Sequence, residues 1–66
     1  MDLTVNGEHR TLPGPASVAD LVRELTHRGT GVAVAVNGEV VPRSAWTTTA
    51  VNAQDAIEIL TAVQGG

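Results

Sequence analysis

The residues best suited to chemistry stand at the carboxyl end of this sequence, where an apolar, β-prone segment is followed by Gln64, Gly65 and Gly66. Two successive glycines make a tail thin enough to enter a narrow cleft and to bring the α-carboxylate with it. That carboxylate is ionised at neutral pH and is a poor electrophile until it is activated. Transfer to AMP would activate it, and sulfide or a persulfide could then attack the acyl carbon of Gly66.

Other reactive groups are scarce. The sequence has no cysteine, which excludes a thiolate nucleophile and a thiolate metal ligand. It also has no lysine, so no ε-amine of the protein competes for an activated terminus. The two histidines, His9 and His27, fall on a polar strand and near a helix end, where solvated structural roles are expected. No spacing of His or acidic residues predicts a metal site. We therefore expect no bound cofactor or metal, and a protein on which other enzymes act.

Length and charge narrow the class of protein. The chain has 66 residues, enough for one small domain, and a net charge of −3 without the basic stripe that nucleic acid attracts. Its longest apolar run, Val32–Val36, is far shorter than a membrane-spanning helix, and the first residues lack the pattern of a signal peptide. We expect a cytoplasmic protein that is monomeric when free.

Two hairpins are predicted by two Asn-Gly pairs, the strongest short-range signal for a tight turn between strands. The tetrad Val-Asn-Gly-Glu occurs at 5–8 and again at 36–39. In the first hairpin the alternating residues of Met1–Val5 pair with Glu8–Leu12. In the second, Val32–Val36 pairs with the short segment that begins at Glu39.

One helix is predicted between the hairpins, over Val18–Arg28. Ser17 and Asp20 have the spacing of a capping box, and cations followed by glycine suit the helix end at 27–29. One apolar stripe follows the helical period: Val18, Leu21, Val22 and Leu25.

The remaining segments complete an α+β fold. Arg43–Val51 has no clean period and is predicted to be a turn or a short irregular strand, whereas Ala56–Val63 is the last strand. A single helix on a mixed sheet of four or five strands buries these faces economically, which is the β-grasp, or ubiquitin-like, arrangement. Right-handed crossovers then pair Met1–Val5 in parallel with the last strand. We expect residues 1–63 to form the domain and 64–66 a flexible tail.

Three residues outside the tail are candidates for recognition or packing. An ionised Glu58 must face water, so Leu60, two residues on, should also be exposed. Leu60 is then either an ordinary scattered surface residue or an anchor for enzymes that hold the tail. Trp46, the single aromatic residue, is expected in the core. Arg43 is expected at the rim, either solvated or paired with an acidic group of a partner.

Four stretches spread over almost the whole chain form a specific pattern: Val5–Glu8, Ser17–Leu21, Val34–Ser44 with Trp46 after it, and Ile57–Gly66. In these stretches the sequence resembles the ThiS family, the sulfur carriers of thiamine biosynthesis. The resemblance implies a β-grasp fold and a Gly66 that an E1-like adenylating enzyme activates with ATP. Gly66 would then become a thiocarboxylate, with sulfur from a cysteine desulfurase or rhodanese-type donor, and thiazole synthase would use it.

The same resemblance assigns the rest of the tail. Gly65 matches the second glycine, and Gln64 and Val63 lead into it. One departure is Gln54-Asp55, where such proteins commonly have Gly-Asp in the turn before the last strand. Two other interpretations stay open: the small subunit of molybdopterin synthase, a sibling carrier with the same tail, and a ubiquitin-like interaction module whose Gly-Gly is inert.

Overall fold

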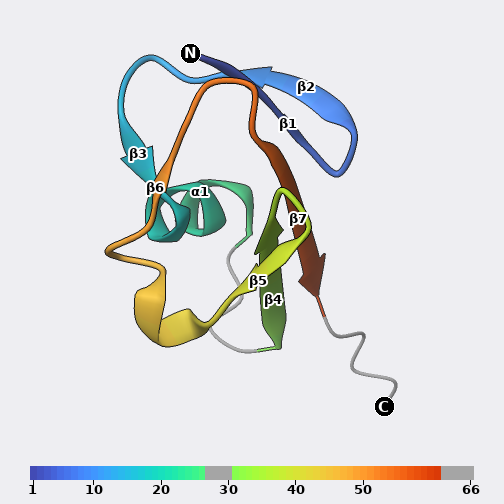
Figure 1. Cartoon of the computed structure of the whole chain (residues 1–66), viewed down its shortest axis with the longest axis vertical. Helices are drawn as coiled ribbons and strands as arrows, with labels where there is room; N and C mark the ends of the chain where they lie inside the picture. Colours follow the sequence, from blue (N-terminus) through green and yellow to red (C-terminus); the bar gives the residue numbers. More distant parts are fainter. Residues whose placement is uncertain (27–30, 62–66) are drawn as a thin grey trace.

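One helix packs on a mixed sheet, as the order of the predicted elements requires. The computed structural model describes residues 1–26 and 31–61. Its elements, drawn in Figure 1, are β1 (Asp2–Val5), β2 (Glu8–Thr11), β3 (Ala16–Ser17), α1 (Val18–Leu25), β4 (Val32–Val36), β5 (Glu39–Val41), the 3₁₀ turn η1 (Arg43–Ala45), β6 (Ala50–Val51) and β7 (Ala56–Thr61).

The first and last strands lie side by side in the middle of this sheet. The strand order is β2-β1-β7-β4-β5, and β7 is the central strand. β1 runs parallel to β7, with Val5 opposite Ile57. β4 runs antiparallel to β7, and every residue of β4 has a partner in β7. The expected parallel pairing is therefore confirmed, and residues 62 and 63 of the predicted last strand lie outside the described residues.

Both Asn-Gly pairs form the predicted hairpin turns. Asn6 and Asn37 have φ values of 53° and 52°, and the glycines after them have 80° and 84°. Left-handed backbone at both central positions is the requirement of the tight hairpin turn, and Asn and Gly tolerate it best. β1 and β2 pair antiparallel across the first turn, and β4 and β5 across the second.

Helix α1 begins where the sequence predicts and ends earlier. The Ser17 hydroxyl accepts from the Asp20 amide at 3.1 Å, and the Asp20 carboxylate accepts from the Ser17 amide at 3.0 Å, which completes the capping box. These hydrogen bonds lower the pKa of Asp20. The prediction of a helix to Arg28 was wrong, because Thr26 is already extended, with φ −147°. Residues 27–30 lie outside the described residues, which contain no helix able to span a membrane.

The core lies between α1 and the inner face of the sheet, which is the face turned toward the helix. Ile57 and Ile59 of β7 contribute to it, and their exposed fractions are 1% and 9%. The apolar stripe of α1 covers them as predicted, except that Leu25 is only partly buried. The buried apolar residues are Leu3, Val5, Leu12, Val18, Leu21, Val22, Val34, Trp46, Val51, Ile57 and Ile59.

A second, two-stranded sheet closes one end of the core and was not predicted. β3 pairs antiparallel with β6, so the chain just before α1 is tied to the segment before β7. The first helical amides also find acceptors there, because the Val18 amide donates to the Thr49 carbonyl and the Ala19 amide to that of Trp46. Amides in the first turn of a helix have no partner within the helix, so this irregular segment stabilises the helix start.

The turn before β7 is fastened by a buried carboxylate. Asp55 is 8% exposed and accepts from the Asn52 amide at 2.7 Å and from the Asn37 side chain at 3.0 Å. Gln54 precedes it with φ 71°, a left-handed conformation that glycine adopts more readily. The departure from Gly-Asp noted in the sequence therefore leaves the turn in place, with backbone strain at Gln54.

We expect Gln54→Gly to raise the free energy of unfolding by up to about 1 kcal/mol, because glycine relieves the strain of a left-handed side-chain-bearing residue. Gln54→Ala is the matched control, since it removes the side chain and keeps the strain, and it should change stability little. Urea denaturation of the three proteins measures both effects. A Gly variant no more stable than the Ala variant would show that the backbone here is unstrained.

Candidate functional site

The strand that leads to the tail is the central strand of the sheet. β7 has a neighbouring strand on each edge, and its start and middle are buried on the inner face at Ile57 and Ile59. The predicted tail residues Val63, Gln64, Gly65 and Gly66 lie outside the described residues. The structure therefore describes the platform from which the tail continues, up to Thr61.

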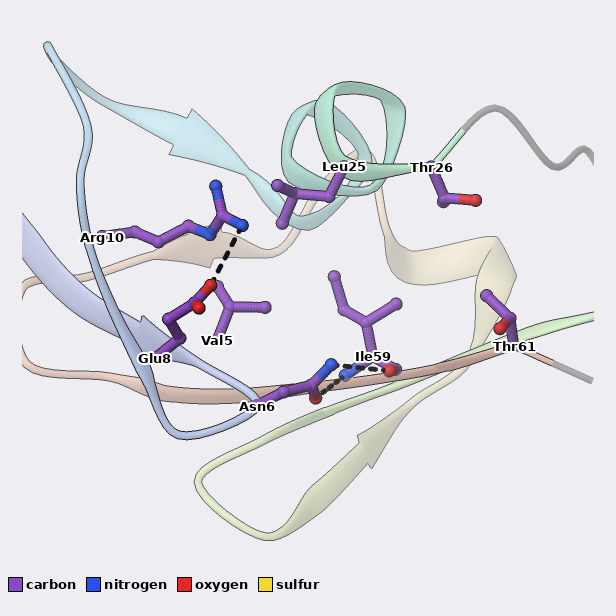
Figure 2. Close-up of a pocket in the computed structure, with 8 residues that line it drawn as sticks. All are labelled: Val5, Asn6, Glu8, Arg10, Leu25, Thr26, Ile59 and Thr61. Carbon is purple, nitrogen blue, oxygen red and sulfur yellow. Dashed lines mark hydrogen bonds and ion pairs between the residues drawn. The ribbon is translucent and has the colours of Figure 1, made fainter.

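Two asparagine side chains bind β7, one near each end. The Asn6 carboxamide oxygen accepts from the Ile59 amide at 2.9 Å, and its nitrogen donates to the Ile59 carbonyl at 3.1 Å (Figure 2). The Asn37 oxygen accepts from the Ala56 amide at 2.9 Å. The repeated Val-Asn-Gly-Glu tetrad thus does more than form two turns, because each asparagine also holds the central strand.

The outer face of the sheet, which is the face turned away from α1, carries an apolar patch beside the end of β7. Leu60 is 67% exposed and Val40 is 77% exposed, and Glu58 is exposed as expected. Cross-strand partners share a face, and the registers place Leu60 opposite Ala33, and Ala35 opposite both Glu58 and Val40. We call Ala33, Ala35, Val40, Glu58 and Leu60 the outer-face patch.

The sequence interpretation found Leu60 and missed Val40, although the signal was present. A two-residue turn at Asn37-Gly38 pairs Val36 with Glu39 and therefore Ala35 with Val40. Small alanines alternate with buried or half-buried valines along Val32–Val36, which indicates that the alanines and Val40 share the outer face. Reading the turn and the alternation together would have extended the patch from one strand to three.

Trp46 and Arg43 are in contact with each other. Trp46 is buried, 8% exposed, and its indole Nε1 donates to the Val41 carbonyl at 2.9 Å. This burial confirms the expectation that Trp46 packs in the core. The Arg43 guanidinium lies 5.5 Å from the centre of the Trp46 ring, and Arg43 is an exposed residue. Arg43 is thus a rim residue as expected, with a cation–π contact that the sequence analysis did not anticipate.

A hollow of about 500 Å³ opens beside the end of β7, under the last turn of α1. Figure 2 shows Ile59 pointing from β7 toward Leu25, while Arg10 and Glu8 of β2 form an ion pair at the edge, 3.4 Å apart. The lining of this hollow therefore combines apolar side chains, such as Ile59 and Leu25, with an exposed ion pair. His9 lies on β2, 3.6 Å from the Asp2 carboxylate, and no group of three possible metal ligands comes together within residues 1–26 and 31–61.

Comparison with known proteins identifies the fold. A crystal structure of the thiamine biosynthesis protein ThiS from Geobacter metallireducens matches the whole of both chains, with a TM-score of 0.85 and 39% sequence identity. A solution structure of a thiamine biosynthesis protein from the same organism matches with a TM-score of 0.83 and 39% identity, over the whole of this chain and 88% of that one. One helix on a mixed five-stranded sheet thus defines a β-grasp domain of the ubiquitin-like class.

The family follows from the sequence match. The model of the ThiS family matches residues 3–66, and the chain belongs to that family, the sulfur carriers of thiamine biosynthesis. A thiazole synthase from Paramagnetospirillum magneticum is 39% identical over all 66 residues, and the chain spans a fifth (20%) of its length. An uncharacterized protein, ycf40, from Porphyra purpurea is 30% identical over the whole chain and 93% of its own length.

Proposed function

We propose that this protein carries sulfur as a thiocarboxylate on Gly66 and delivers it for formation of the thiazole ring of thiamine. The observation that supports this most directly is the match of the ThiS family through residue 66, which includes the Gly-Gly end. The described platform suits that role, because the segment before the tail is the central strand of the sheet. The protein contributes the carboxylate and a docking surface, and partner enzymes contribute catalysis.

The chemistry begins with an oxygen of the Gly66 carboxylate attacking the α-phosphorus of ATP, and pyrophosphate leaves. Hydrosulfide then attacks the acyl carbon of the adenylate, and AMP leaves with one carboxyl oxygen and the bonding electron pair. If the donor is a persulfide, the same attack forms an acyl disulfide, which a thiol must reduce to free the thiocarboxylate. Glycine suits both attacks because it has no β-carbon to hinder them.

Three kinds of partner are required by this sequence of steps. An E1-like adenylating enzyme supplies the ATP site, a cysteine desulfurase or rhodanese-type protein supplies sulfur, and thiazole synthase consumes it. The match between this chain and part of a protein named thiazole synthase supports the last of these. We propose that the protein meets these partners in the cytoplasm.

Intact-protein mass spectrometry tests the proposal after incubation with ATP, the adenylating enzyme and a sulfur donor. The expected product has one oxygen replaced by sulfur, and fragmentation localises the change to Gly66. Adding thiazole synthase and its small substrates should then consume the thiocarboxylate and form thiazole. No exchange with partners that modify another member of the family would reject the carrier function, and consumption only in molybdopterin synthesis would indicate the sibling carrier.

The outer-face patch is the surface by which we expect the adenylating enzyme and thiazole synthase to hold the sheet. Leu60→Asp should weaken both complexes by at least about tenfold, because it puts a charge into an apolar contact and next to Glu58. The fold should survive, since Leu60 is 67% exposed and lies outside the core. Binding isotherms with each partner measure the loss, and melting curves check the fold.

Thr47→Asp is the matched control for Leu60→Asp. It adds the same charge at an exposed position outside the outer-face patch, so it should leave both affinities unchanged. Val40→Asp extends the test across the sheet, because Val40 lies two strands away from Leu60. If Leu60→Asp binds both partners as tightly as Thr47→Asp does, Leu60 is an ordinary surface residue.

A further inference from the structure

The Asn6 carboxamide takes the place of a strand at the point where β1 ends. The β1–β7 register runs from Thr4 opposite Ala56 to Val5 opposite Ile57, and the Asn6 amide then donates to the Ile57 carbonyl at 2.8 Å. The chain turns away at Asn6, but its side chain accepts from the Ile59 amide and donates to the Ile59 carbonyl. A carboxamide has the donor and acceptor of a peptide group, so the ladder continues for one more step.

This step falls close to the end of β7. On the β1 edge, Ile59 is the last residue of β7 that the described chain holds, whereas on the other edge β4 pairs with β7 as far as Thr61. Without the Asn6 side chain, β7 beyond Ile57 would be held on one edge only. A strand held on one edge frays more readily at its end.

The position of this end matters for the proposed chemistry. Leu60, in the outer-face patch, lies directly between Ile59 and Thr61, and Gly66 follows Thr61 five residues later in the sequence. Five residues of extended chain span at most about 18 Å, so the distance from the docked sheet to the partner's ATP site is limited. A fixed starting point for the tail raises the share of bound complexes in which the carboxylate reaches that site.

We propose that Asn6 is a positioning residue for the activation of Gly66. Its carboxamide holds the end of β7 and thereby sets the distance between the outer-face patch and the tail. The inference rests on the proposed function, since it concerns the same carboxylate. Loss of the carboxamide should slow activation within the bound complex and leave docking through Leu60 unchanged.

Asn37 provides an unusually close control. It stands in the same tetrad, with φ 52° against 53° for Asn6, and its side chain also binds β7. It does so at Ala56, the first residue of the strand, and so at the end remote from the tail. Replacing either asparagine by glycine removes two side-chain hydrogen bonds and keeps the left-handed backbone comfortable.

The experiment compares Asn6→Gly with Asn37→Gly at a temperature where both are folded. With saturating adenylating enzyme and ATP, single-turnover formation of the adenylate should slow by about tenfold in Asn6→Gly, as expected for a misplaced reacting group, and stay unchanged in Asn37→Gly. The dissociation constant of the docked complex should be the same for both. Amide exchange should show loss of protection at Ile59 in Asn6→Gly only.

A conservative variant separates the two hydrogen bonds. Asn6→Asp keeps the acceptor for the Ile59 amide but sets a carboxylate oxygen against the Ile59 carbonyl, so its activation rate should also fall below that of the wild type. Equal slowing in Asn6→Gly and Asn37→Gly would show that the loss is general and would overturn the inference, as would a normal rate in Asn6→Gly. Failure of the wild type itself to form the adenylate would instead reject the proposed function.

Discussion

Deleting Gly66, or adding one residue after it, is expected to abolish the proposed oxygen-to-sulfur exchange. Either change moves the carboxylate by about 3.5 Å of extended chain, which is more than an active site that positions a nucleophile can absorb. Intact-protein mass spectrometry with ATP, the adenylating enzyme and a sulfur donor measures the exchange. Undiminished exchange in the extended variant would show that the carrier group is not the Gly66 carboxylate.

Both length variants should remain folded. Neither described residue after Ile59, Leu60 or Thr61, belongs to the buried core, and we expect the free energy of unfolding to change by no more than about 0.5 kcal/mol. Gln64→Ala is the control that changes the tail without changing its length, and it should still be converted. Thermal denaturation first compares the melting temperature of each variant with that of the wild type, because unfolding alone would also abolish the exchange.

In the Trp46→Ala variant, most molecules are expected to be unfolded. Truncation of a buried tryptophan costs about 3 to 5 kcal/mol, and a core of this size supplies about that much in total. Trp46 is 8% exposed, and its truncation would also leave the Val41 carbonyl without the indole donor and remove the ring that the Arg43 guanidinium contacts. Circular dichroism and urea denaturation check the loss.

Trp46→Phe separates packing from recognition, because an unfolded Trp46→Ala cannot report on binding. Phenylalanine fills most of the space and loses the indole hydrogen bond to Val41, so a loss of about 1 kcal/mol is expected, with normal partner affinity. A binding defect in Trp46→Phe at normal stability would make Trp46 a recognition residue. Arg43→Ala then tests whether the exposed guanidinium contributes to a complex.

Local features of the fold were predictable because they depend on neighbours in the sequence. The hairpin turns need left-handed backbone at adjacent residues, which Asn6-Gly7 and Asn37-Gly38 supply. The start of α1 needs a capping box, which Ser17 and Asp20 form within one turn. The exposure of Leu60 follows from its alternation with buried Ile59 and from the charge of Glu58.

Features that depend on long-range contacts were missed. The helix end was also predicted too late. Cations and a glycine suit a helix end near Arg28, but the backbone already leaves the helical conformation at Thr26. The pairing of β3 with β6 joins residues far apart in the chain, and nothing in the two-residue segments Ala16–Ser17 and Ala50–Val51 signals it. Asp55 is buried although carboxylates are usually exposed, because the Asn52 amide and the Asn37 side chain donate hydrogen bonds to it. Asn37 comes from a distant hairpin, so the sequence around Asp55 does not reveal this burial.

By itself, the sequence determined the class of fold and indicated the reacting group that we propose. Its periods, turns and caps specify one helix between two hairpins, and Gly66 needs no tertiary contact to carry a carboxylate. Only the tertiary structure decided which residues surround that end of the chain. The outer-face patch joins β7, β4 and β5 through their register, and the Asn6 carboxamide meets Ile59 across 53 positions of sequence. Hairpin turns encode the pairing of strands that are adjacent in sequence, but no local pattern encodes the register of β7 on β4 or the contact of Asn6 with Ile59.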